Sequence, residues 1–173
     1  MRPLTVLLLA GITLVTASLS AQSVPYSHTS NPRELQVFKK AMTLTELGNA
    51  LNNSGPFTIF APTDAAFRKM RETEGQDPLQ PENRKQLRSL VAYHIVAGEL
   101  TASRILKALC QGEGTAVFTT VLGEPLIATL EGTDIVLMDC TGNQARIIRA
   151  DAGSDNLVYH EIDTVVLPAK PGP

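Results

Sequence analysis

The sequence lacks an excess of positive charge. Its 173 residues include 15 Lys and Arg against 17 Asp and Glu, which leaves a net charge of −2 at pH 7. Binding to a nucleic-acid backbone requires clusters of basic side chains that neutralise phosphates, so we expect no nucleic-acid partner. Trp is absent and aromatic residues make up only 5% of the chain. The length nevertheless suffices for one domain with its own core.

Beyond its first residues, the sequence has no apolar run that approaches the roughly 20 residues needed to cross a bilayer. Near its start, Arg2 precedes an apolar run at residues 4–15 and a series of small residues at 17–21. This order is typical of a secretory signal peptide, which we assign to residues 1–21. We expect a flexible leader at 22–30, a tail at 170–173, and a secreted, extracellular or periplasmic chain without stable membrane insertion after signal cleavage.

Cysteine is scarce, because Cys110 and Cys140 are the only two in the sequence. Their spacing fits no zinc-binding pattern. In an oxidising compartment an even pair favours a disulfide, which would be worth about 3–4 kcal/mol in the chain-entropy model. We expect the pair to be bridged, and the alternative is two separate buried thiols.

Motifs for catalysis and cofactor binding are also missing. The sequence has no Gly-x-Ser-x-Gly nucleophile elbow, no phosphate-binding glycine loop and no dinucleotide fingerprint. Residues 151–156 resemble a calcium loop only faintly, because Gly153 stands at a ligand position and Ile162 replaces the bidentate Glu. We therefore expect no enzyme activity, no cofactor and no metal.

Residues 55–67 carry the clearest local pattern, Gly-Pro-Phe-Thr-Ile-Phe-Ala-Pro-Thr-Asp-Ala-Ala-Phe. The Gly-Pro pair favours a turn, and the aromatic and β-branched run after it favours a short buried strand. Pro62 limits further strand pairing, and Thr63 can cap a helix whose first turn holds Asp64. We expect a rigid strand-to-helix corner. Its structural side chains are Phe57, Phe60, Pro62, Thr63 and Phe67.

The hydrophobic period changes near residue 114. Before this point, capping patterns at 31–34 and 43–46 and helical spacing at 81–95 predict several helices. His94 falls on the apolar face of the 81–95 helix, where a core histidine with both ring nitrogens hydrogen-bonded is expected. The segments with strand-like alternation are 115–121, 126–130, 134–138, 144–150 and 157–167. Helices followed by strands predict an α+β domain with an antiparallel meander.

Three stretches together resemble the fasciclin-type domain family. Residues 55–67 resemble its first signature, and Tyr93 and His94 stand where the family carries a Tyr-His pair. Residues 156–168, which read Asn-Leu-Val-Tyr-His-Glu-Ile-Asp-Thr-Val-Val-Leu-Pro, resemble its closing signature. The resemblance covers residues 31–169 as a single domain. It implies a β-wedge or β-sandwich of antiparallel strands flanked by several N-terminal helices.

The signature positions supply the candidate site residues. The resemblance implies a largely structural Tyr-His pair, and His160 in the closing strand is expected to satisfy a neighbouring backbone group. Glu161 replaces the apolar residue that is common in the family at its position. The candidates for binding are Asp64, Tyr93, His94, Asn156, Tyr159 and Asp163. Those expected to face a ligand are Asp64, Tyr159 and Asp163.

Three functions remain open from the sequence, and the third is a stability or envelope-organising protein with no discrete ligand. An exported, non-enzymatic adhesion or interaction module would bind a cell-surface or matrix protein or a polysaccharide by surface complementarity. The alternative is a small extracytoplasmic hydrolase or ligand carrier with a pocket that contains His94 or His160, since His is the residue most often used in acid–base chemistry. An imidazole that opens into a cleft would favour the second function.

Overall fold

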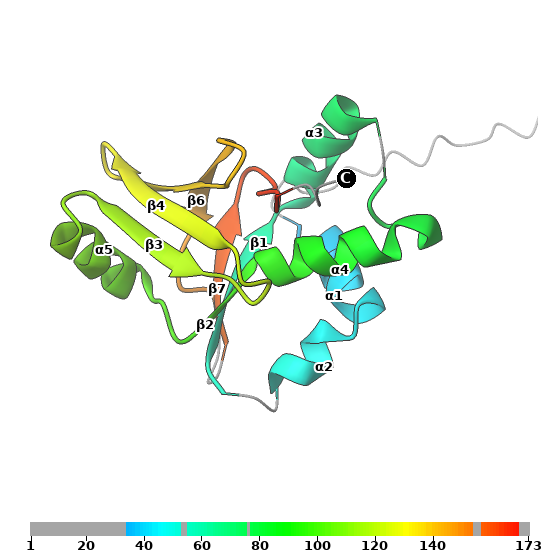
Figure 1. The fold of residues 1–173 in the computed structure, drawn as a ribbon, viewed down its shortest axis with the longest axis horizontal. Coiled ribbons are helices and arrows are strands. Elements are labelled where there is room, and N and C mark those ends of the chain that lie inside the picture. Colours follow the sequence, from blue (N-terminus) through cyan, green and yellow to red (C-terminus); the bar gives the residue numbers. More distant parts are fainter. Residues whose placement is uncertain (1–33, 53–54, 76, 154–156, 170–173) are drawn as a thin grey trace, which may run out of the picture.

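The computed structural model describes residues 34–52, 55–75, 77–153 and 157–169. The predicted signal peptide, leader and tail lie outside these ranges, as does Asn156. Helices come first and most strands follow, so the predicted α+β class is confirmed (Figure 1). The helices are α1 Gln36–Leu44, α2 Leu47–Asn52, α3 Asp64–Glu74, the 3-10 helix η1 Pro81–Asn83, α4 Arg84–Tyr93 and α5 Ala102–Gln111. The strands are β1 Phe57–Pro62, β2 Ile95–Ala97, β3 Thr115–Thr119, β4 Pro125–Glu131, β5 Asp134–Met138, β6 Gln144–Arg149 and β7 Leu157–Ile162.

The strands of the described chain form a mixed sheet in the order β2-β1-β7-β6-β5-β4-β3. β3 to β6 form the predicted antiparallel meander, and β6 pairs antiparallel with β7. β1 and β7 are instead parallel, with Phe60 opposite His160, which the long chain between them permits. A bridge from Val96 in β2 to Thr120 beyond β3 joins the two ends of the sheet. The sheet is therefore nearly closed.

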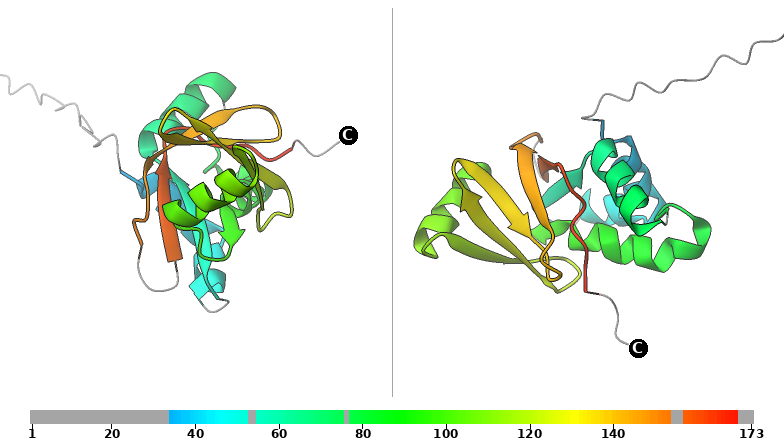
Figure 2. Two further views of the ribbon diagram at one scale, coloured as in Figure 1. Left: turned by 90° about the vertical axis from the view of Figure 1, so that its left-hand side faces the viewer. Right: turned by 90° about the horizontal axis from the view of Figure 1, so that it is seen from above.

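Helices cover this sheet at two places. α1 to α4 lie together beside β1, whereas α5 packs on β3 and β4 at the far end of the molecule (Figures 1 and 2). Two clusters of buried apolar side chains follow from this arrangement. Phe67 belongs to the cluster between the helices and β1, and Phe60 belongs to the cluster enclosed by the curved sheet and α5. The corner between β1 and α3 thus contributes one phenylalanine to each core.

The strand-to-helix corner at residues 55–67 has the structure that its residue types predict. Pro62 is the last residue of β1, and the Thr63 hydroxyl accepts a hydrogen bond from the Ala66 backbone N–H at 3.2 Å. Phe60, Pro62, Thr63 and Phe67 are buried, and Phe57 is half-buried. α3 is followed by its C-cap residue Gly75, which has a φ of 68°. A residue with a side chain would be strained in this left-handed conformation.

The predicted helix start at residues 31–34 falls mostly outside the described residues, and Glu34, which is described, lies before α1 and not within it. α1 begins at Gln36, and its N-cap residue Leu35 makes no side-chain capping bond. The cap comes from the corner instead, because Asp64 Oδ1 accepts a hydrogen bond from the Val37 N–H at 2.9 Å. The Asp64 N–H also donates to the Glu34 carbonyl at 2.7 Å. A contact between residues so far apart in sequence has no local signal.

The predicted helix over residues 81–95 is too long. A turn of 3-10 helix precedes α4, which ends at Tyr93, and His94 is the C-cap residue. Ile95 was expected on the apolar helix face, but it lies in β2 and pairs with Ile59. Ile95 is fully buried as a strand residue. Its helical spacing from the other apolar residues could not distinguish a buried strand position from a buried helix position.

The predicted disulfide between Cys110 and Cys140 is also wrong, because both are free thiols and both are exposed. Cys110 lies near the C-terminal end of α5. Cys140 follows β5, with its Sγ 3.7 Å from the Leu167 carbonyl oxygen and 4.0 Å from Glu124 Oε2. The two thiols therefore lie in different surroundings. Their even number and the expected compartment favoured a bridge that the fold does not form.

Candidate ligand pocket

His94 is fully buried at the end of α4. Its Nδ1 lies 2.7 Å from the Leu90 carbonyl oxygen, to which it donates, and its ring lies 5.8 Å from the Phe38 ring. Nε2 has no hydrogen-bond partner within the described chain, contrary to the expectation that both nitrogens are hydrogen-bonded. Burial lowers the pKa of His94 to about 4, although the Leu90 carbonyl and Asp139 oppose the shift. The imidazole is therefore neutral at physiological pH.

His160 is also enclosed, on the opposite side of β1. Its ring stacks on Phe60 at 5.4 Å between centroids. Nδ1 accepts a hydrogen bond from the Asp151 N–H at 3.4 Å, and Nε2 donates to the Leu100 carbonyl at 2.7 Å. Burial lowers the pKa of His160, with the Leu100 carbonyl and Asp151 opposing. Both ring nitrogens are thus hydrogen-bonded to backbone groups.

Tyr93 and the acidic signature residues are engaged in structure as well. The Tyr93 hydroxyl donates to the Pro125 carbonyl at 2.8 Å, and burial raises the pKa of Tyr93. Asp64 is buried and caps α1, as described above. Asp163 is exposed, and its Oδ1 accepts a hydrogen bond from the Arg146 N–H at 2.9 Å. Each of these side chains therefore links two segments of the fold.

Asp139 is a structural residue that sequence reasoning missed. It is 2% exposed, and its carboxylate accepts five hydrogen bonds from Thr141, Asn143 and Leu167. Burial alone would raise the pKa of Asp139, but these hydrogen bonds outweigh it and lower the pKa. The signal available in the sequence was an Asp two residues before a Thr-Gly-Asn turn, the usual position for an Asp that organises a turn.

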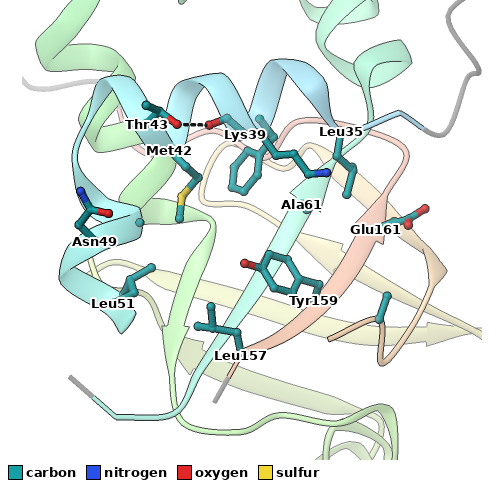
Figure 3. A pocket seen from close by; sticks show the side chains of 13 residues that line it. Leu35, Lys39, Met42, Thr43, Asn49, Leu51, Ala61, Leu157, Tyr159 and Glu161 are labelled. Carbon is teal, nitrogen blue, oxygen red and sulfur yellow. Dashed lines mark hydrogen bonds between the residues drawn. The ribbon is translucent and has the colours of Figure 1, made fainter. Parts of the chain in front are cut away.

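A pocket of about 460 Å³ opens between the first two helices and the parallel strand pair (Figure 3). α1 and α2 form one wall, and β1 and β7 form the other. The residues that line it are Leu35, Phe38, Lys39, Met42, Thr43, Gly48, Asn49, Leu51, Ala61, Ala152, Leu157, Tyr159 and Glu161. Most of these side chains are apolar. Among the predicted binding residues that the structure describes, Tyr159 is the one that lines this pocket.

The alternation of β7 explains which side chains reach the pocket. Tyr159 and Glu161 face it, whereas Ile162 belongs to the core inside the sheet and His160 packs on Phe60 of that core. Ala61 lies directly opposite Glu161 in the register of β1 and β7. Because Ala has the smallest side chain with a Cβ, the space beside Glu161 is left open.

Glu161 is the unusual member of the pocket. It is 4% exposed, and its Oε1 lies 3.2 Å from an Arg149 guanidinium nitrogen whose side chain is 65% exposed. Its Oε2 is buried and has no hydrogen-bond partner within the described ranges. An unmatched acceptor is costly to bury. The lining of this mostly apolar cavity therefore includes one residue with a buried, unpaired acceptor oxygen.

This geometry gives no support to a pocket built around histidine. Neither His94 nor His160 lines the cavity, and both are held by backbone carbonyls. Among the described residues, no group of three or more His, Cys, Asp or Glu side chains is placed to hold a metal ion. No described helix is both long and apolar enough to span a bilayer.

Comparison with known proteins identifies a matching family and several relatives. The model of the fasciclin domain family matches residues 33–168. Protein sll1483 of Synechocystis sp. is 34% identical over 128 residues, which are 74% of this chain and 64% of that protein. The cell surface glycolipoprotein MPB83 of Mycobacterium bovis is 32% identical over 120 residues, or 67% of this chain and 46% of that protein. This chain thus spans less than two thirds of either relative.

A solved structure shows the same fold. It is a FAS1 domain pair from the insect cell adhesion molecule fasciclin I, with a TM-score of 0.58 and 23% sequence identity. The similar region covers 76% of this chain and 44% of the domain pair. At this identity the likeness establishes the architecture only.

Proposed function

Because this chain belongs to the fasciclin domain family, we propose that it is a non-enzymatic adhesion or interaction module that acts outside the cytoplasm. Its partner would be a cell-surface or matrix protein or a polysaccharide. The names of the mycobacterial relative, a cell surface glycolipoprotein, and of the insect adhesion molecule support a role in surface recognition. The apolar run behind Arg2 supports export.

The observation that carries this proposal is the placement of the signature side chains. Asp64, Tyr93 and His94 each bond to backbone groups of other turns or segments, which stiffens the domain. Tyr159, from the closing signature, is half-buried in the open pocket face. A stiff domain with one hollowed face suits recognition, because little conformational entropy is lost on binding. We therefore place the recognition surface around the pocket formed by α1, α2 and β7.

Capture from the host's own envelope fraction tests the proposal. The purified chain, tagged at its C-terminus, is immobilised, and retained material must be displaced by an excess of the untagged folded chain. Lys39→Glu reverses a charge on the pocket face, and Lys107→Glu reverses a charge on α5; both lysines are exposed. We expect Lys39→Glu to weaken capture about fivefold or more, which corresponds to about 1 kcal/mol, while Lys107→Glu leaves it unchanged.

Two results would count against the proposal. One is retention that untagged chain cannot displace, because such binding is not specific. The other is equal loss of capture with both lysine variants, which would show that net charge and not the pocket face governs binding.

A further inference from the structure

The pocket contains one feature that a packing role does not explain. Glu161 is nearly fully buried, yet its Oε2 faces no donor within the described part of the chain. Glu161 lies at one end of the row of β7 side chains that line the cavity, after Leu157 and Tyr159, with α1 across from β7 (Figure 3). Oε1 pairs with Arg149, so Oε2 is the part of this acid that the described fold does not use.

We propose that this pocket binds a small amphiphile, with an ammonium group against Glu161 Oε2 and an apolar body against the α1 and α2 walls. This inference goes beyond the proposed function, because it concerns a small ligand inside the pocket and not the macromolecular partner. Pockets that take small molecules have volumes of about 300–1,000 Å³, mostly apolar walls and a few fixed polar groups. The cavity of about 460 Å³ meets all three conditions.

The charges of the site favour a cationic head group. Arg149 neutralises Glu161 only from the solvent side, since its own side chain is 65% exposed. The other oxygen, Oε2, is buried beside the partly apolar cavity without a donor, and in such surroundings a charge-assisted hydrogen bond is stronger than a neutral one. A carboxylate ligand would meet repulsion at the same atom. Lys39 lies on the α1 wall but is exposed, so its ammonium can remain in solvent.

The apolar walls of the pocket would contact the apolar body of the ligand. Phe38, Met42 and Leu51 come from the helices and Leu157 from β7. Met adapts to ligands of different shape because its side chain is unbranched. Thr43 does not compete for the head group, since its hydroxyl donates to the Lys39 carbonyl at 3.0 Å. The head group is therefore recognised by Glu161, and the body by shape and burial.

The test compares three eight-carbon probes with different head groups: octylamine, octanol and octanoate. Their affinities for the purified chain are measured by NMR titration at pH 7. We expect octylamine to bind most tightly and octanoate at least about tenfold more weakly, the difference expected from one charge-assisted hydrogen bond. Glu161→Gln should remove the preference for the amine. Glu131→Gln should keep it, because Glu131 also pairs with an arginine but does not line the pocket.

Three outcomes would overturn the proposal: equal binding of all three probes, an unchanged ranking in a folded Glu161→Gln variant, or no binding at millimolar probe. A second measurement does not depend on the variant folding. Bound octylamine should give intermolecular nuclear Overhauser effects to the methyl groups of Met42 and Leu157 in the unaltered chain. Contacts to the outer face of α5 instead would contradict the site.

Discussion

At the scale of single residues, the buried imidazoles connect stability to pH. His94 has a pKa of about 4 in the folded chain because it is buried, whereas an unfolded His has a pKa near 6.5. Protons therefore bind the unfolded chain more readily at this residue. The contribution of neutral His94 to the free energy of unfolding is fully present above about pH 6.5 and is lost as pH falls toward 4. We expect His94 to account for a loss of up to about 3 kcal/mol over this range. His160, whose pKa is also lowered, adds to the loss.

Urea unfolding at pH 7.5 and pH 4.5 measures this effect. The control is His94→Gln, which keeps a side-chain donor for the Leu90 carbonyl but cannot titrate. Its stability should fall less between the two pH values than that of the unaltered chain. An identical fall in both proteins would mean that His94 is not the group responsible.

Asp139 should contribute more to the stability of the fold than its position in a turn suggests. Its carboxylate receives hydrogen bonds from the turn and from Leu167, and so ties the closing segment to β5. Asp139→Asn replaces one acceptor oxygen by a donor, and we expect it to reduce the free energy of unfolding by about 3 kcal/mol. Asp163→Asn is the matched control, because Asp163 is exposed and accepts one backbone hydrogen bond. It should cost less than about 1 kcal/mol in the same urea titration.

At the scale of elements, Asp64 joins two helices. It is the first residue of α3 and the cap of α1. Asp64→Ala should destabilise the domain by about 1–2 kcal/mol and accelerate hydrogen exchange at Val37 and along the first turn of α1. Thr101→Ala removes the side-chain cap of α5 and should accelerate exchange in α5 but not in α1. Equal protection of α1 in both variants would contradict the capping role.

The helices and strands also show how much of the fold could be predicted from the sequence. Strands β3 to β6 were predicted nearly in place, because alternation of apolar residues and turn residues are local signals. The predicted strand 157–167 is too long, because β7 ends at Ile162. The start of α1 was not predicted, since its cap lies in Asp64, far along the chain. The short β2 was read as helix because Ile95 is apolar in either setting. The pocket could not be predicted, because it forms only where α1 and α2 meet the parallel pair of β1 and β7.

Glu161 is the part of the site for which the sequence did carry a signal. An acid at a position that is apolar in the family marked it as a departure, but the sequence could not say that its carboxylate would be enclosed. Tyr159 was a candidate because of its place in the closing signature, and it lines the pocket. The other candidates within the described residues, Asp64, Tyr93, His94 and Asp163, lie elsewhere and bond to backbone.

At the scale of the whole molecule, stability should not depend on a cross-link. Cys110 and Cys140 are both free and exposed, so dithiothreitol should leave the melting temperature unchanged. Alkylation of the folded, unreduced chain with iodoacetamide should add two groups by mass spectrometry. Burial and the nearby Glu124 and Asp139 raise the pKa of Cys140, so its alkylation should accelerate with rising pH. A chain that resists alkylation until reduced would contain the disulfide that the fold lacks.

The whole molecule is proposed to be a stiff domain that presents one hollowed face to a partner. The most direct test of this proposal is the competition capture from envelope extract with the two lysine variants. We predict that Lys39→Glu, on the pocket face, loses most of the displaceable capture, while Lys107→Glu, on α5, retains it. Full capture by Lys39→Glu together with loss of capture by Lys107→Glu would place recognition on the opposite end of the molecule and contradict the account.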